Sequence, residues 1–189
     1  MKLIGLALAG LLALAGFSGT AAAAEDDYLT IQLKDGPVVI ELLPNVAPQH
    51  VARMKELASK GEYDNVAFHR VIEGFMAQTG DVQFGDMQDG FDGSRAGTGG
   101  SSLPDLPAEF SDVPFERGTV GMARAQDPNS ANSQFFIMFA DGSFLNGQYT
   151  VVGKVVSGME NVDKIKRGEG GNGEVSDPDR MIKVTVGRP

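Results

Sequence analysis

Hydrophobic and polar residues alternate along much of the chain, which is the pattern of β-strands with one buried face. The clearest case is residues 28–33, where Leu29, Ile31 and Leu33 share a face. A glycine-containing turn follows, and a second alternating run covers 38–43. Two such runs joined by a short turn predict a β-hairpin. The same reasoning predicts further strands at 66–72, 75–79, 119–123, 134–138, 150–156 and 181–186.

Apolar residues recur at helical spacing in two other places. The first predicted helix lies between residues 44 and 61, with Pro48 in its first turn and Gly61 as its stop. The apolar residues of the two helices are Val51, Met54, Leu57 and Ala58, and then Met159, Val162 and Ile165. Eight strands and two helices in one domain predict a mainly β fold, a closed eight-stranded antiparallel barrel with a helix over each end.

Two of the predicted strand regions are apolar on both faces. In residues 133–139 the faces divide into Phe135 and Ile137 on one side and Gln134, Phe136 and Met138 on the other. In FHRVIEGFMAQTGD, residues 68–81, the second face is predicted to carry Phe68, Arg70 and Ile72, with Met76 and Gln78 sharing a face beside Phe75. An apolar outer face that carries arginine and glutamine is typical of a peptide or ligand groove. The alternative, that loops or helices simply cover this face, fits the pattern equally well.

The first 24 residues have the layout of a secretory signal peptide. Lys2 provides a positive start, an apolar run covers 3–17, and the alanines at 22–24 fit a cleavage site before Glu25. A transmembrane anchor is the alternative, but the apolar run is too short to span a bilayer comfortably. We therefore expect a signal peptide at 1–24, a mature domain at 25–189, and a periplasmic location without membrane attachment after cleavage.

Composition narrows the possible partners. The net charge of −9 argues against binding to nucleic acid and to anionic membranes. The absence of cysteine excludes both a disulfide framework and a lipid-anchored cysteine. We expect a monomer that packing alone stabilises.

The usual catalytic signals are missing. His50 and His69, the two histidines, lack the companions that a metal site needs, so both are interpreted as structural or surface residues. The mature chain has no G-x-S-x-G motif, and GTGG at 97–100 lacks the context of a phosphate loop, so it is interpreted as a tight turn. The long glycine-rich segment 80–118 is of the kind that is functional or disordered. No metal and no cofactor are expected.

Several motifs, in the right order, carry a family resemblance. FHRVIEGFMAQTGD closely resembles the signature of cyclophilin-type peptidyl-prolyl cis-trans isomerases, and so does GTVGMARAQDPNSANSQFFIMFADGSFLNGQYTVVGKVVSGMENVDKI. The loop GTGG fits between them, and the likeness runs from about Tyr28 to the C-terminus. The resemblance implies the same closed barrel with two helices. It also implies an enzyme that accelerates Xaa-Pro isomerisation in proline-containing polypeptides, here during the folding of exported proteins.

The resemblance also implies roles for individual residues. Arg70 matches the catalytic residue, and Gln78 matches a position that holds the arginine and contacts substrate. The proline pocket is matched by Phe75, Met76, Phe136 and Leu145, and the remaining substrate-binding positions by Ala123, Arg124, Gln134, Phe144 and Tyr149.

Three of these positions depart from the common family pattern. Phe144 stands where many members carry tryptophan, Tyr149 where many carry histidine, and Arg124 where asparagine is frequent. Because Phe144 lacks an indole N–H, we expect weak binding of cyclosporin. The departures leave a second hypothesis open, in which the protein is a peptide-binding chaperone or scaffold that uses the same groove with little turnover.

Overall fold

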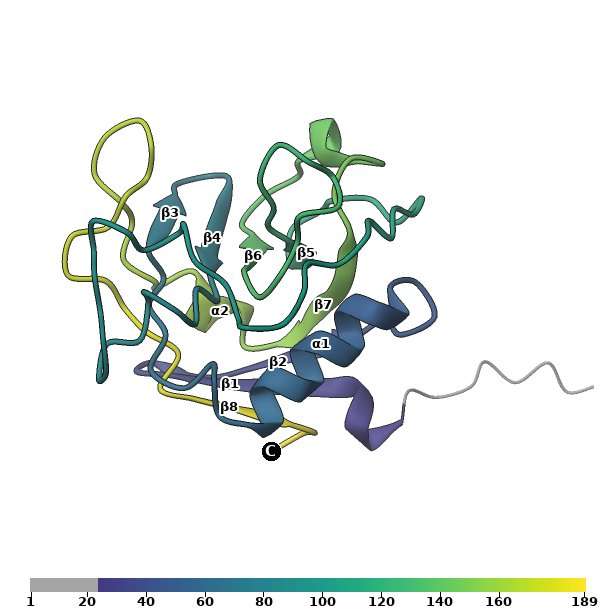
Figure 1. Ribbon diagram of the computed structural model, residues 1–189, viewed down its shortest axis with the longest axis horizontal. Helices are drawn as coiled ribbons and strands as arrows, with labels where there is room; N and C mark the ends of the chain where they lie inside the picture. The colour runs from purple at the N-terminus through teal and green to yellow at the C-terminus, as the bar shows by residue number, and fades with distance from the viewer. Residues whose placement is uncertain (1–23) are drawn as a thin grey trace, which may run out of the picture.

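The computed structural model describes residues 24–189, drawn in colour in Figure 1. The predicted signal peptide therefore lies outside the described residues, apart from Ala24. A short 3-10 helix, η1 (Glu25–Asp27), leads directly into the first strand. The sequence pattern did not predict this turn of helix, since it is only three residues long.

Eight antiparallel strands form one sheet in the order β3-β4-β6-β5-β7-β2-β1-β8. Their bounds are β1 (Tyr28–Leu33), β2 (Gly36–Leu42), β3 (Arg70–Ile72), β4 (Met76–Thr79), β5 (Thr119–Met122), β6 (Phe135–Met138), β7 (Val151–Ser157) and β8 (Lys183–Val186). In Figure 1, β1, β2 and β8 cross the lower part of the molecule, and β3, β4, β5 and β6 lie above them. The prediction of eight antiparallel strands is confirmed, including the β1–β2 hairpin with Leu33 opposite Gly36.

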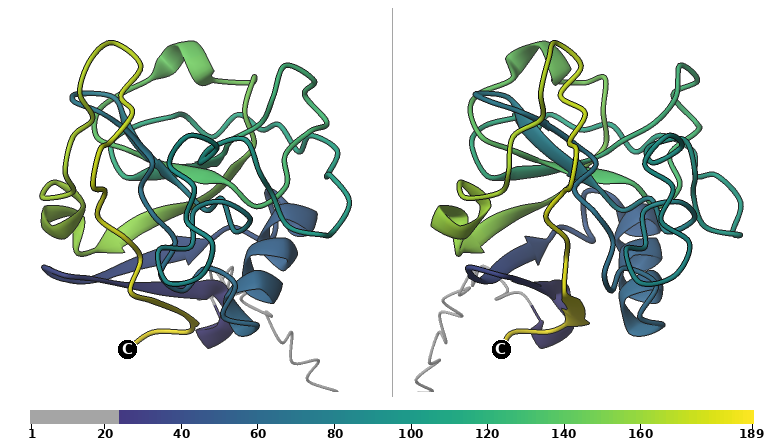
Figure 2. Two further views of the ribbon diagram at one scale, coloured as in Figure 1. Left: turned by 60° about the vertical axis from the view of Figure 1, so that its left-hand side comes forward. Right: turned by 90° about the vertical axis from the view of Figure 1, so that its left-hand side faces the viewer.

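The predicted closure of the barrel is wrong, because β3 and β8 are the two edges of the sheet and do not pair. The segment before β8 occupies the outer edge of β3. The N–H of Val71 donates to the carbonyl of Gly173 (2.7 Å), and the N–H of Val175 donates to the carbonyl of His69 (3.1 Å). Since this segment fills the position that β8 would take, the sheet is a curled half-barrel (Figure 2).

Two α-helices pack on the sheet, α1 (Pro48–Ser59) and α2 (Met159–Val162). Helix α1 confirms the predicted amphipathic helix, with its four apolar residues buried in the core. Helix α2 is a single turn, shorter than the predicted stripe, and Ile165 is buried beyond its end. The side chain of Asn161 ties α2 to the sheet, since its Nδ2 donates to the carbonyl of Pro37 (3.0 Å).

The buried apolar residues form two separate clusters. We call the larger one the main core; it lies inside the half-barrel and includes Phe135 and Ile137. The smaller one, the groove cluster, consists of Met76, Phe115, Phe136, Met138, Leu145 and Val151. The predicted division of β6 between two faces is thus confirmed. The prediction for Phe68 is wrong: it packs in the main core with Val71, because the strand begins only at Arg70 and alternation does not extend back to residue 68.

The long segment between β4 and β5 is held by side chains that accept hydrogen bonds from its backbone. The carboxylate of Asp81 is fully buried and accepts from the N–H groups of Gln83, Phe84, Gly97 and Gly99. The prediction of a turn at GTGG is confirmed only at its start: the turn covers 93–97, Gly97 has φ 98°, and the N–H of Thr98 donates to the carbonyl of Arg95 (2.9 Å). Among the described residues, no helix combines the length and the apolar character needed to cross a bilayer.

Candidate active site

Arg70 is the first residue of β3 and lies opposite Gln78 of β4. Its guanidinium is held at two nitrogens: Nη1 donates to Oε1 of Gln78 (3.3 Å), and Nε donates to the backbone carbonyl of Asn172 (2.9 Å). In the described part of the chain Nη2 makes no hydrogen bond. Arginine presents five N–H donors in a rigid plane, so anchoring two nitrogens fixes the direction of the third.

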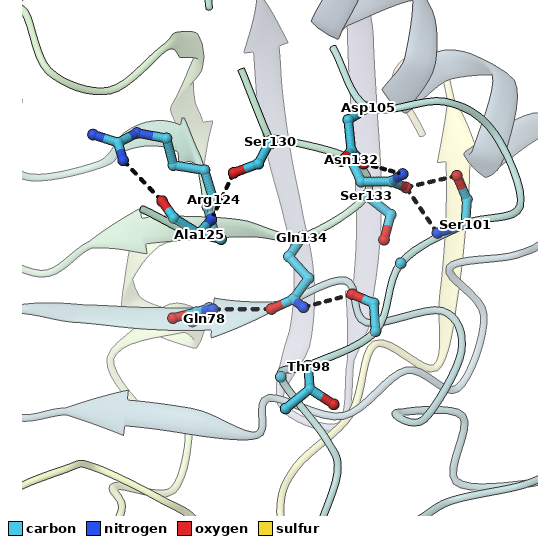
Figure 3. A pocket seen from close by; sticks show the side chains of 14 residues that line it. Gln78, Thr98, Ser101, Asp105, Arg124, Ala125, Ser130, Asn132, Ser133 and Gln134 are labelled. Atoms are coloured by element: carbon cyan, nitrogen blue, oxygen red, sulfur yellow. Dashed lines mark hydrogen bonds between the residues drawn. The ribbon is translucent and has the colours of Figure 1, made fainter. Parts of the chain in front are cut away.

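A chain of side-chain amides continues from Arg70 across the groove. Nε2 of Gln134 donates to the carbonyl of Gly99 (2.8 Å), and Nε2 of Gln78 donates to Oε1 of Gln134 (2.9 Å), as Figure 3 shows from close by. Because the carbonyl of Gly99 can only accept a hydrogen bond, it orients the amide of Gln134, which in turn orients the amide of Gln78. Oε1 of Gln78 is therefore left to accept from the arginine.

An apolar pocket of about 400 Å³ opens beside Arg70. It is lined by Arg70, Phe75, Met76, Gln78, Ala123, Arg124, Phe136, Phe144, Leu145, Gln148 and Tyr149. The structure thus brings together all the site residues expected from the sequence except Gln134, which lines the adjoining pocket and bonds to Gln78. Gln148 was not expected, since nothing in the sequence distinguishes it.

Aromatic pairs build the walls of this pocket. The ring of Phe136 stacks on Phe115 (5.7 Å between centroids) and meets Tyr149 edge-on (6.0 Å). Phe144 is 64% exposed and leans on Phe75 at the rim (5.5 Å). The floor of the pocket is formed by Met76 and Phe136, which are almost entirely buried.

Two of the departures from the common family pattern contact each other. The guanidinium carbon of Arg124 lies 4.5 Å from the centre of the Tyr149 ring, within the range of a cation–π interaction. Nη2 of Arg124 also donates to the carbonyl of Gln148 (3.0 Å), and Nη1 donates to the carbonyl of Ala125 (2.8 Å). Arg124 therefore joins the loop after β5 to the loop before β7 at the rim of the groove.

A second, more polar pocket of about 530 Å³ adjoins the first, and the two share Gln78, Ala123 and Arg124. Figure 3 shows Thr98, Ser101, Asp105, Ser130 and Asn132 around it. Oδ1 of Asn132 accepts from the N–H of Ser101 (2.8 Å), which fixes the loop at this wall. The sequence reasoning missed this pocket. The GTGG motif was the signal for it in the sequence, since residues 97–100 line this pocket. A glycine is needed at position 99 because a Cβ there would lie 2.5 Å from the Asp81 carboxylate.

From the sequence, both histidines are interpreted as structural or surface residues. Both are buried, so they are structural residues and not surface ones. Nδ1 of His50 lies 2.7 Å from Oε2 of Glu109. Burial alone would raise the pKa of Glu109, but hydrogen bonds from His50 and Gln49 outweigh it and lower that pKa. Burial lowers the pKa of His69, and neither of its ring nitrogens makes a hydrogen bond to the part of the chain that the structure describes. Within residues 24–189, no group of three histidine, cysteine or carboxylate side chains is placed to hold a metal ion.

A curled antiparallel half-barrel with an arginine beside an aromatic pocket, and a polar pocket next to it, is an arrangement with room for a peptide. The family model of cyclophilin type peptidyl-prolyl cis-trans isomerase/CLD matches residues 28–186. The chain belongs to this family and is a peptidyl-prolyl cis-trans isomerase.

Individual relatives agree with this assignment. A protein of Brucella suis described as a probable peptidyl-prolyl cis-trans isomerase is 65% identical over 184 residues, which cover 96% of this chain and 94% of the relative. A peptidyl-prolyl cis-trans isomerase of Helicobacter pylori is 37% identical over 77% of this chain and 84% of its own length. A Cryptosporidium parvum cyclophilin solved in the presence of the dipeptide Ala-Pro superimposes with a TM-score of 0.72 at 25% identity, covering 86% of this chain and 99% of that one.

Proposed function

We propose that Arg70 is the catalytic residue and that it stabilises the twisted state of an Xaa-Pro peptide bond. Rotation about this bond faces a barrier of about 18–20 kcal/mol because the planar amide is stabilised by resonance. When the bond twists, resonance is lost and the prolyl nitrogen regains a lone pair. A donor aimed at this nitrogen binds the twisted state better than the planar one, which is the condition for raising kcat.

The observation that carries this proposal is the arrangement of the guanidinium. Nε and Nη1 of Arg70 are held by Asn172 and Gln78, Nη2 makes no hydrogen bond within residues 24–189, and Arg70 lines the apolar pocket. A proline ring in that pocket excludes water, which strengthens the field of the arginine. An acceleration of about 10⁵-fold would require about 7 kcal/mol from all interactions together.

The neighbouring backbone supplies a place for the rest of the peptide. Within the described residues, the carbonyl of Ala123 and the N–H of Arg124 make no hydrogen bonds, although both residues line the groove. Unpaired backbone groups of this kind can pair with an extended substrate. A polypeptide with its proline in the apolar pocket can follow this edge into the polar pocket, because the two pockets adjoin.

The cellular setting belongs to the same proposal. The signal-like segment 1–24 supports export, a periplasmic location and substrates among exported proteins that are still folding. We expect the protein isolated from a periplasmic extract to begin at Glu25, as a monomer. N-terminal sequencing and size-exclusion chromatography with light scattering would measure both. An unprocessed N-terminus in the cytoplasmic fraction would contradict export.

The catalytic assignment is tested by Arg70→Ala in an isomerisation assay on a short Xaa-Pro peptide. We expect kcat/KM to fall by roughly 10²–10³-fold, the loss typical of removing one transition-state donor. The thermal midpoint should change little, because Arg70 is partly exposed. Arg188→Ala is the matched control, since Arg188 is an exposed arginine that packs on the ring of Tyr28 and lines neither pocket.

Two outcomes would contradict the proposal. Wild-type activity in the Arg70→Ala variant would show that another group stabilises the twisted bond. Peptide binding by the purified wild-type protein without any acceleration would favour the chaperone or scaffold hypothesis instead.

A further inference from the structure

The chain between α2 and β8 forms a loop that returns along the outer edge of β3. Its tip consists of Gly170 and Gly171, which have no neighbouring atoms near their Cβ positions. Its returning arm, residues 172–175, runs beside β3, where Glu174 and Arg70 form an isolated antiparallel β-bridge through their backbones. We call residues 172–175 the return arm. Figures 1 and 2 show this part of the chain, in yellow-green to yellow, rising beside β3.

The return arm touches the arginine through its backbone. The carbonyl of Asn172 accepts from Nε of Arg70 (2.9 Å), and the next carbonyl, that of Gly173, accepts from the N–H of Val71 (2.7 Å). The two contacts are made by consecutive residues in β3 and by consecutive residues in the return arm. The position of the return arm therefore sets where the Nε acceptor lies relative to β3.

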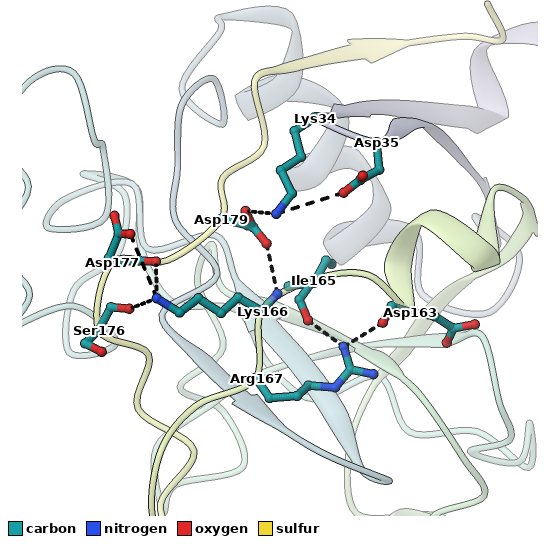
Figure 4. Close-up of polar contacts among 9 residues, drawn as sticks. All are labelled: Lys34, Asp35, Asp163, Ile165, Lys166, Arg167, Ser176, Asp177 and Asp179. Atoms are coloured by element: carbon teal, nitrogen blue, oxygen red, sulfur yellow. Dashed lines mark hydrogen bonds and ion pairs between the residues drawn. The ribbon is translucent and has the colours of Figure 1, made fainter.

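Polar contacts hold the base of the loop, as Figure 4 shows. Nζ of Lys166 reaches across to the carbonyls of Ser176 (2.6 Å) and Asp177 (3.0 Å). The N–H of Lys166 donates to Oδ2 of Asp179 (2.9 Å), whose other oxygen accepts from Nζ of Lys34 (2.6 Å). These bonds join the outgoing arm of the loop to the returning arm and to the β1–β2 turn.

Gly173 fixes the return arm against β3. It is buried, it has φ 73°, and a Cβ at this position would lie 2.3 Å from Cγ1 of Ile72. An alanine would be strained in the left-handed conformation and would push the arm away from the strand. Gly171, two residues earlier, is exposed, and a Cβ there meets nothing.

We propose that the return arm is a positioning element for catalysis, in which the Asn172 carbonyl sets the plane of the Arg70 guanidinium. This inference rests on the proposed role of Arg70. With Nη1 bonded to Gln78, the second anchor at Nε removes the remaining rotation of the guanidinium plane and aims Nη2. Asn172 acts through its backbone carbonyl on Arg70 and lines neither pocket, so it is a positioning residue.

The test compares Gly173→Ala with Gly171→Ala, the same substitution in the same loop. We expect Gly173→Ala to lower kcat by about tenfold or more, as a misplaced catalytic group does, and to leave KM nearly unchanged. The ¹⁵N resonance of Arg70 Nε should shift, because its carbonyl partner moves. Gly171→Ala should leave kcat, KM and this resonance at their wild-type values.

Both substitutions are then repeated in the Arg70→Ala background, which separates positioning from general damage. We expect Gly173→Ala to cause no further loss there, because the group that it misplaces is absent. An equal loss in both backgrounds, or full activity despite a shifted Nε resonance, overturns the inference. Wild-type activity of Arg70→Ala alone contradicts the proposed function instead, so the two failures are distinguishable.

If Gly173→Ala fails to fold, Lys166→Met takes its place, since Lys166 is exposed and holds only the base of the loop. Its matched control is Lys60→Met, which removes an exposed ion pair with Glu56 on α1. The expected result is a smaller fall in kcat with the same shift of the Nε resonance. Unchanged kcat and resonance in Lys166→Met overturn the inference.

Discussion

The two faces of β6 serve different purposes although their residues are adjacent in the chain. Phe135 and Ile137 belong to the main core inside the half-barrel, and Phe136 and Met138 belong to the groove cluster outside it. Both sets are buried, so burial alone does not separate a structural residue from one that lines the site. The two sets differ in their neighbours. The groove cluster adjoins Arg70 and the amide of Gln78, whereas the interior residues pack on apolar neighbours.

The sharpest test of this difference is Phe135→Ala against Phe136→Ala. Removal of Phe135 leaves a closed cavity beside Tyr63, so we expect a loss of about 3–5 kcal/mol in the free energy of unfolding. The remaining folded protein should keep nearly wild-type kcat/KM. Urea unfolding and the isomerisation assay measure the two quantities on the same samples.

Phe136→Ala should have the opposite effect, with a small loss in the free energy of unfolding and a large loss in kcat/KM. Its ring lines the open pocket, so its removal enlarges a space that water can enter, and we expect a smaller loss of stability than for Phe135. Activity should fall strongly because the proline loses an apolar wall. Equal effects of the two variants on both quantities would refute the division of β6 into two roles.

A smaller effect is expected from pH, through His69, the sequence neighbour of Arg70. Burial lowers its pKa below the ordinary 6.5, so the unfolded chain takes up a proton at a higher pH than the folded protein does. The contribution of neutral His69 to the free energy of unfolding is therefore fully present above pH 6.5. It falls as the pH drops toward the pKa of His69 in the folded protein, by at most about 1.4 kcal/mol per pH unit.

Denaturation of wild type and His69→Leu between pH 7.5 and pH 5.5 would measure this contribution. The range stays above the ordinary pKa of 4.5 for Glu109, whose own contribution is lost only at lower pH. We expect a shallower pH dependence in His69→Leu. Identical slopes would show that burial does not hold His69 neutral in the folded protein.

The smallest effect is expected at the rim, where Phe144 is largely exposed. Phe144→Ala should change the free energy of unfolding by no more than about 0.5 kcal/mol, as surface substitutions usually do. Its loss of contact with Phe75 and with the peptide should raise KM by about two- to tenfold, the range expected for one aromatic contact. Unchanged KM would place Phe144 outside the binding surface.

Local sequence patterns predicted the strands and α1 well because hydrophobic periodicity reports which face is buried. They failed where tertiary contacts decide. Phe68 was assigned to the groove face because alternation cannot show that β3 begins only at Arg70. Closure of the barrel was expected from the strand count, which cannot show that residues 173–175 take the edge of β3.

The candidate site came mostly from the family resemblance, because side chains from distant strands meet there. Arg70, Phe136 and Tyr149 are far apart in sequence, and periodicity indicated only that one face was apolar and carried polar groups. The partner of Arg70 at Asn172 is a backbone carbonyl, and a carbonyl leaves no trace in residue identity. Residue identity likewise does not distinguish Gly173 from Gly171, because only the tertiary fold puts Ile72 against Gly173 and nothing against Gly171.

The open sheet has a consequence for a protein of a peptide-binding family. An uncovered edge strand invites an extended polypeptide to add itself as a further strand and so to aggregate. Here residues 173–175 occupy the edge of β3, and on β8 the carboxylate of Asp64 accepts from the N–H of Val184 (2.9 Å) and pairs with Lys183 (2.6 Å). Under the proposed function, a peptide substrate would therefore pair its backbone with the groove and not with the edges of the sheet.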